Sequence, residues 1–298
     1  MDQALNFQAL SQNLVFGLLV GALYGLVALG LSLVFGVTKF LNVAHGELLM
    51  FGGYASFWAF SLLGIDPFLS IPITIIFLSL IGALLYKLVF SRTVKLPEES
   101  KIKNTLLVAF GLSVILQNLA LRFWSADERG ITTSYFSTAF TVMGVRFPIS
   151  KVANLVVAIV FLIALQLFLK KTYTGKAIRA TTQNWEAASL MGIDIHKVYL
   201  LSFALGAALA GVAGTLVAIN YSIQPSMGLG WTMKALIVMV LGGLGNIPGT
   251  IIGGLILGVT ESTTSFFISS NYREVAGLIL FILVLIFRSQ GFFGSKEV

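Results

Sequence analysis

The chain has 298 residues, of which 57% are hydrophobic and only 10% are charged, whereas about a quarter of the residues in soluble domains are charged. It has no cysteine and two histidines, which excludes disulfides and thiol catalysis and argues against a metal site built by the chain alone. The net charge of +7 fits the collection of Lys and Arg in the cytoplasmic loops of membrane proteins, so it does not indicate nucleic-acid binding.

Apolar segments follow one another along the whole chain. They lie at about 14–37, 43–63, 68–90, 105–122, 151–169, 198–219, 231–266 and 274–287. A membrane-crossing helix needs about 20 apolar residues, so the sequence predicts an all-α polytopic membrane protein with about 8–9 transmembrane helices, some of them broken or re-entrant. Residues 1–13 contain no Lys or Arg and therefore lack the basic start of a signal peptide. We expect one membrane domain over residues 1–298, with no sizeable soluble domain.

The positions of the basic residues predict the topology. Basic residues cluster in the connections around Arg92–Lys103 and Lys170–Lys197, whereas residues 64–67 and 220–230 contain none. Loops rich in Lys and Arg face the cytoplasm, so we expect the N-terminus outside and the C-terminus, with Arg288, in the cytoplasm. That arrangement requires an odd number of crossings. We therefore expect 231–266 to divide into two segments, giving nine.

Two interruptions of the apolar pattern are candidate linings of a path through the membrane. The first runs Asn42-Val-Ala-His-Gly-Glu47 and the second runs Leu241-Gly-Gly-Leu-Gly-Asn-Ile-Pro-Gly249. Backbone freed from helices cannot face lipid, so it must be buried in protein or line a wet cavity, and paired interruptions often mark a transport route. The candidate residues are Asn42, His45, Gly46, Glu47, Gly242, Gly243, Gly245 and Asn246.

Simpler interpretations remain open for each candidate. His45 and Glu47 could cap helix ends at a wet interface near Lys39. The glycines at 242–245 could form a packing and hinge element, or they could leave amide groups at a helix start that attract a carboxylate. Among later charges, Lys234 is expected to extend to an interface and Glu261 to cap a helix, with an ion pair between them as the weaker alternative.

A polar, helix-forming stretch at 182–198 separates two apolar segments. Thr182 or Asn184 can cap a short helix whose first turn contains Glu186, favourably placed against the helix dipole. We expect Ala187 and Ala188 to form a smooth face and Gly192 to end the helix. Because it falls in a basic connection, this loop is predicted to be cytoplasmic.

These segments together resemble a known family. The Glu186-Ala-Ala188 and Gly192 pattern resembles the coupling loop of ABC importer permeases. The runs Gly30 to Glu47, Leu241 to Gly258 and Gly175-Lys-Ala-Ile-Arg-Ala180 resemble branched-chain amino-acid ABC permeases, in particular the first of their two permease subunits. The likeness extends from about residue 14 to 290. The coupling loop lacks the later Leu-Pro of the wider motif, and Phe287-Arg-Ser-Gln-Gly291 stands where a Pro-Thr-Gly turn is expected.

The resemblance implies the roles and the partners. The chain would be a permease subunit that forms half of a pore, with a coupling loop at about 174–197 and ATPase-coupling residues Glu186, Ala187, Ala188 and Gly192. It would have no catalytic residue, metal or cofactor of its own, since ATP and Mg would be used by a partner. The implied partners are a second homologous permease, two cytoplasmic ATPase subunits, an extracytoplasmic substrate-binding protein and the membrane lipid of a bacterial-type plasma membrane.

Other functions compete with this one. Sister systems of the family carry urea or short amides. A self-sufficient secondary transporter or channel would need coupling carboxylates within the membrane, for which Glu47 and Glu261 are the main candidates. A membrane enzyme is a third class, but the sequence contains neither HExxH nor GxSxG.

Overall fold

The computed structural model describes residues 2–93, 98–133, 135, 138–288 and 290–294, and it is almost entirely helical. The helices are α1 (Asp2–Thr38), α2 (His45–Leu63), α3 (Ile71–Leu85), α4 (Ser91–Thr93), α5 (Glu98–Trp124), α6 (Ile149–Lys171), α7 (Tyr173–Gln183), α8 (Trp185–Leu190), α9 (Ile195–Asn220), α10 (Met227–Gly242), α11 (Ile247–Phe267) and α12 (Arg273–Phe287). A π-helical turn, η1 (Tyr86–Phe90), joins α3 to α4, and a 3-10 turn, η2 (Ser270–Tyr272), precedes α12. Strands β1 (Ala139–Val142) and β2 (Val145–Pro148) form an antiparallel hairpin in which Ala139 pairs with Pro148.

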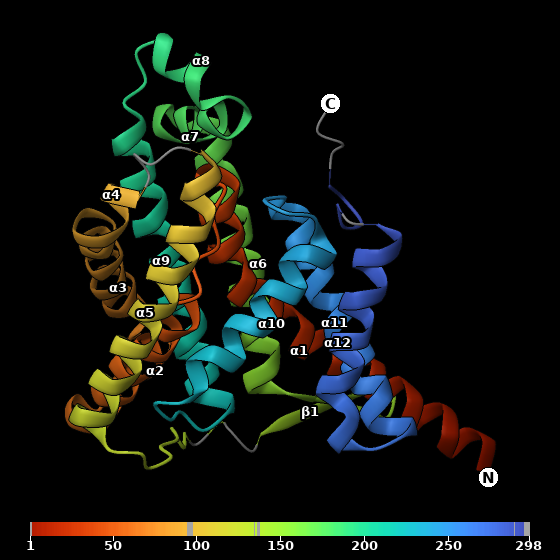
Figure 1. Ribbon diagram of the computed structural model, residues 1–298. Coiled ribbons are helices and arrows are strands. Elements are labelled where there is room, and N and C mark those ends of the chain that lie inside the picture. The colour runs from red at the N-terminus through yellow and green to blue at the C-terminus, as the bar shows by residue number, and fades with distance from the viewer. Residues whose placement is uncertain (1, 94–97, 134, 136–137, 289, 295–298) are drawn as a thin grey trace.

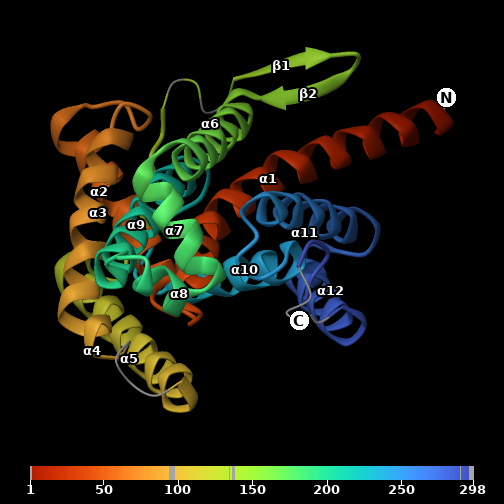
Figure 2. The same cartoon turned by 90° about the horizontal axis from the view of Figure 1, so that it is seen from above.

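The bundle has a central layer and a periphery (Figures 1 and 2). The most apolar windows of α1 and α9 are each 78% buried, against 22% for α5 and α6 and 11% for α12. Helix α1 packs against α11 through glycines: a Cβ at Gly21 would lie 2.7 Å from the carbonyl oxygen of Gly254. In lipid, helices associate through such close backbone approach. The core therefore lies around α1, α2, α9 and α10, and peripheral helices expose apolar side chains.

The two ends of the bundle differ in what they carry. Helices α7 and α8 lie at one end with the last described residues, and the β1–β2 hairpin and the start of α1 lie at the other (Figure 1). At the hairpin end, Arg129 and Ile223 exchange backbone hydrogen bonds of 2.9 and 2.7 Å, and the Tyr135 hydroxyl donates to Asp66 Oδ2 (2.9 Å). The sequence predicts that the connections at 64–67 and 220–230 lie on the same side of the membrane. In the structure both lie at the hairpin end of the bundle.

The expected fold class is confirmed, and the division of 231–266 is also confirmed. Among the described residues, seven helices are long and apolar enough to cross a membrane. Helix α10 is shorter, and α2, with 19 residues, is not one of the seven. The nine expected segments correspond to α1, α2, α3, α5, α6, α9, α10, α11 and α12, but α7 and the β1–β2 hairpin were not anticipated. Both are short and lack the long apolar runs that identify spans.

Candidate functional site

The loop between α6 and α9 forms a compact helical unit at one end of the bundle (Figure 1). The Thr172 hydroxyl accepts from Gly175 N (2.9 Å) and caps α7. Asn184 Oδ1 accepts from Ala187 N (2.9 Å) and caps α8, whereas Thr182 donates back to Ile178 O within α7. Asn184 is therefore the cap, and the alternative that placed Thr182 there is wrong.

Helix α8 presents apolar side chains to solvent. Trp185 is 50% exposed, Leu190 89% and Met191 85%, and Glu186 and Ala187 are exposed beside them. Ala188 is only 4% exposed, so it packs α8 onto the unit and does not extend the outer face. Exposed apolar side chains grouped on a capped helix are typical of a protein-binding surface.

The chain leaves α8 by a glycine turn and enters α9 through a second cap. Gly192 has a φ of +83°, the left-handed conformation that glycine adopts without steric cost. Asp194 Oδ1 then accepts from Lys197 N (3.1 Å), and the Lys197 ammonium lies 3.2 Å from Asp194 Oδ2. The Lys197 backbone N–H, together with its side chain, lowers the pKa of the Asp194 carboxyl below its ordinary value. Both ends of α8 are thus fixed.

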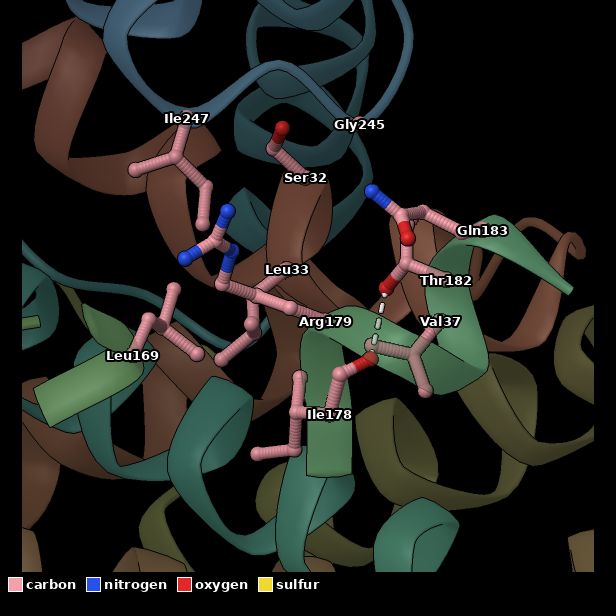
Figure 3. A pocket seen from close by; sticks show the side chains of 11 residues that line it. Ser32, Leu33, Val37, Leu169, Ile178, Arg179, Thr182, Gln183, Gly245 and Ile247 are labelled. Carbon is pink, nitrogen blue, oxygen red and sulfur yellow. Dashed lines mark hydrogen bonds between the residues drawn. The ribbon is translucent and has the colours of Figure 1, made fainter. Parts of the chain in front are cut away.

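A pocket connects this unit to the membrane helices (Figure 3). It has a volume of about 180 Å³ and lies between α1, α7 and the turn that joins α10 to α11. Arg179, Thr182 and Gln183 of α7 line one wall, and Gly245 and Ile247 of the turn line another. Helix α7 and the α10–α11 turn therefore face each other across this pocket.

The first break, at 42–47, lies deep in the bundle. His45 Nε2 donates to the carbonyl oxygen of Val27 (3.0 Å), in the middle of α1. Gly46 N donates to Thr232 Oγ1 (2.8 Å), and that hydroxyl bonds to Val43 O (3.0 Å). Asn42 Oδ1 accepts from Ala44 N (3.2 Å) and stabilises the turn before α2.

Glu47 lies in the first turn of α2 and is only 1% exposed, as is His45. The alternative in which these residues cap helix ends at a wet interface is therefore wrong. Ser113 of α5 donates to Glu47 Oε1 (3.1 Å), while Oε2 has no hydrogen-bond partner among the described residues. On the other side, Gly228 of α10 lies so close that a Cβ there would overlap the carboxyl group.

The second break, at 241–249, forms a tight turn at the α7 end of the bundle. Gly243 and Gly245 have φ of +94° and +76°, and Gly242 packs against Gly249. Asn246 Oδ1 accepts from Gly249 N (2.9 Å) and caps α11. The Gly249 amide at the start of α11 is thus already bonded to an acceptor from the same chain.

The C-terminal tail covers this turn. Phe292 N donates to Leu241 O (2.9 Å), and Asn246 Nδ2 donates to Phe293 O (2.7 Å). The tail, expected to deviate from the family pattern, is therefore part of the second break.

A charged cluster joins four helices near the opposite end of the bundle. Glu261 of α11, 2% exposed, accepts from Lys234 Nζ (3.0 Å) and Arg273 Nε (2.6 Å). The Tyr24 hydroxyl donates to Glu261 Oε2 (2.7 Å). The interpretation of Glu261 as a helix cap is wrong, because Glu261 lies within α11 and forms the ion pair with Lys234. Lys234 also lies 3.5 Å from Glu274, whose side chain is 79% exposed.

Several residues of these sites escaped the sequence analysis. Ser113 and Thr232 are single hydroxyls in apolar segments and carry no sequence signal that distinguishes them. Arg273, at the start of α12, does carry one, since an arginine at the edge of an apolar segment can pair with an isolated carboxylate. The two breaks do not meet: the first contacts Val27 in the middle of α1, and the second lies against Gly36 near the end of α1.

Comparisons with known proteins agree on one family. The model of the branched-chain amino acid transport system / permease component family matches residues 13–287. The chain is 32% identical to the high-affinity branched-chain amino acid transport system permease protein BraD of Pseudomonas aeruginosa, over 96% of each chain. It is 32% identical to LivH, a permease protein of the same description from Escherichia coli, again over 96% of each. A probable LivH from Methanocaldococcus jannaschii is 30% identical over 90% of this chain and 88% of the relative.

Proposed function

Because the chain belongs to the family of branched-chain amino acid transport permeases, we propose that it imports branched-chain amino acids as the membrane subunit of an ATP-driven transporter. The relatives from Pseudomonas aeruginosa, Escherichia coli and Methanocaldococcus jannaschii are named for branched-chain amino acids, which favours this cargo over urea or short amides. ATP and Mg would be used by a separate ATPase.

The exposed surface of α8 is the observation that carries the coupling role. This surface, formed by Trp185, Glu186, Ala187, Leu190 and Met191, projects from the bundle on a helix capped at both ends. A rigid helix with an apolar face suits insertion into a groove of a partner. We propose that a cytoplasmic ATPase binds here and that α7 transmits its movement.

The orientation follows from the same assignment. With α8 in the cytoplasm, the described end of the C-terminal tail is also cytoplasmic and the start of α1 is outside (Figure 1). The basic residues of α6 and α7, including Lys170, Lys171 and Lys176, then lie on the cytoplasmic side, as such residues commonly do.

The pore requires further subunits. A second homologous permease would complete it, two ATPases would bind the pair of coupling loops, and an extracytoplasmic binding protein would deliver cargo to the hairpin end. Within this chain we assign the path to the two breaks: Asn42, His45, Gly46 and Glu47, and Gly242, Gly243, Gly245 and Asn246. Support comes from the irregular backbone at 39–44 and 243–246, to which these residues belong or adjoin, because backbone freed from helices cannot face lipid.

A charge substitution on α8 tests the coupling role. The full importer, with its own second permease, ATPases and binding protein, is reconstituted in proteoliposomes, and leucine uptake and ATP hydrolysis are measured together. Leu190→Glu places a charge on the exposed apolar surface of α8, so we expect uptake to fall at least about tenfold while the complex stays in the membrane.

Tyr173→Glu is the matched control, because Tyr173 is 84% exposed at the same end but lies at the start of α7, outside the α8 face. We expect its uptake to remain within about twofold of the unmodified protein, the range of a near-neutral contact. Equal losses in both variants, or normal uptake with Leu190→Glu, would remove the assignment of α8 as the coupling helix.

A further inference from the structure

A cavity at the hairpin end of the bundle has no role in the transport mechanism described above. It has a volume of about 130 Å³ and lies between α1, α11 and α12. Its polar lining comes from Asn13, Ser262, Ser265 and Arg273, and Phe16 forms an apolar wall.

Among the described residues, the lining contains one buried hydrogen-bond donor that lacks an acceptor, the amide nitrogen of Asn13. The Ser262 hydroxyl bonds to Asn13 Oδ1 (2.7 Å) and to Asn13 O (2.9 Å). The Asn13 amide nitrogen is buried and has no partner in the described part of the chain. A buried donor without an acceptor costs roughly 1–3 kcal/mol, so a ligand that accepts from this nitrogen would recover that loss.

The surrounding charge is positive. Arg273 and Lys234 share the single carboxylate of Glu261, and Glu274, 3.5 Å from Lys234, has a side chain that is 79% exposed. Lys151 of α6 lies nearby, with its ammonium 4.6 Å from the centre of the Phe16 ring. Across the described residues, no carboxylate forms an ion pair with Lys151, whose charge also interacts unfavourably with that of Arg273.

Within the described chain, the unpartnered Asn13 amide and the unpaired Lys151 ammonium beside Arg273 together indicate an oxyanion. The cavity lies where α6 and α12 begin, at Lys151 and Arg273, and these helices are candidate membrane spans. Phe266, next to Ser265, is 45% exposed, and the span containing α12 is only 11% buried. An occupant with a long apolar part could lie along this surface with its charged end in the cavity.

We propose that this cavity binds the phosphate of an anionic phospholipid headgroup. The Asn13 amide would donate to a phosphate oxygen, Lys151 and Arg273 would balance the charge of the phosphate while Arg273 keeps its bonds to Glu261 and Tyr24, and the acyl chains would lie against α12. The bound lipid would bridge α1, α11 and α12 beside the Glu261 cluster.

Lipid retention by the purified importer tests this proposal. The full complex is exchanged into detergent containing equal amounts of phosphatidylglycerol and phosphatidylethanolamine, and bound lipid is counted by native mass spectrometry. Asn13→Asp keeps the size of the side chain but turns a donor into a carboxylate, and Lys151→Met removes the cation. In each variant we expect retention of phosphatidylglycerol to fall at least about tenfold, because a charge-assisted hydrogen bond or its counter-charge is lost.

Arg122→Gln is the matched control, since Arg122 is an exposed cation near the end of α5 and does not line the cavity. Its phosphatidylglycerol retention should equal that of the unmodified protein. Melting temperature provides a second measurement: phosphatidylglycerol should raise it in the unmodified complex but not in Asn13→Asp.

Two results would overturn the proposal. One is unchanged retention in both cavity variants. The other is stabilisation of the unmodified complex by inorganic phosphate or by leucine, lost in Asn13→Asp, with no preference for phosphatidylglycerol. That result would assign the cavity to a free anion.

Discussion

The two breaks in the helices look alike in the sequence but lie at different depths along α1. The first contacts Val27 through His45, and the second packs against Gly36, where a Cβ would lie 3.3 Å from the Cα of Gly245. Val27 lies 11 residues before the end of α1 at Thr38, which corresponds to about 16 Å along the helix axis. One break is therefore inside the bundle, and the other is a turn at its end.

Their partners differ accordingly. The first break is held by other membrane helices, through Val27, Ser113 and Thr232. The second is held by its own cap at Asn246 and by the C-terminal tail. A substitution in a break that packed helices enclose should therefore destabilise the protein strongly. A substitution in a capped turn at the end of the bundle should remove only the local hydrogen bonds of that turn.

The largest expected effect is that of Gly46→Val. The new side chain would collide with the Gly228 carbonyl and the Thr232 hydroxyl, so we expect a loss of about 3 kcal/mol and a marked drop in the amount of folded protein. Membrane abundance and the melting temperature of the purified complex measure it. Gly230→Val, where a Cβ meets nothing within 4 Å, is the control, and similar losses in both would show that the first break is not tightly packed.

A smaller loss is expected from His45→Leu. The substitution keeps the apolar volume but removes the bond to Val27 O, which should cost about 1.5 kcal/mol. Chemical denaturation of the purified protein gives the difference. A variant as stable as the unmodified chain would mean that this bond does not fix the depth of the break.

At the second break, Asn246→Ala should cost about 1 kcal/mol, because it removes the cap on α11. Asn246→Asp keeps an acceptor for Gly249 N but, like the alanine variant, loses the donor to Phe293 O, so it should recover the part of this loss that comes from the cap. Chemical denaturation of the purified proteins measures the stability of both variants. If the aspartate variant were as unstable as the alanine variant, the cap would not be the source of the effect.

The smallest change in stability, within about 0.5 kcal/mol, is expected for Leu244→Cys, whose side chain is 43% exposed. Since the chain has no other cysteine, a water-soluble maleimide reports directly on this position. The matched variant is Ala44→Cys. Ala44 is 0% exposed, so a cysteine at this position should react only after unfolding in detergent. Equal reactivity in the folded protein would contradict the difference in depth.

Much of the fold could be predicted from the sequence because membrane helices depend on local apolar length. All nine expected segments are helices in the structure. The division within 231–266 occurs at the glycine-rich run, because α10 ends where Gly243 adopts a positive φ. The cap at Asn184 and the turn at Gly192 were also predictable, since both depend on neighbouring backbone groups.

Other features depend on residues far apart in the sequence, so local patterns could not reveal them. Glu261 pairs with Lys234, Arg273 and Tyr24 on three other helices. Glu47 is buried because α5 and α10 close over it, and Ala188 is buried while its neighbour Ala187 is exposed.

The sequence by itself determined the membrane class, the order of the helices and the capped helix in the loop between α6 and α9, because apolar length and helix caps are properties of short segments. Only the tertiary structure decided how deep each break lies and which charges meet. Two interruptions with similar residues can lie at any depth until packing fixes the helices around them, and here α1 contacts one at Val27 and the other at Gly36.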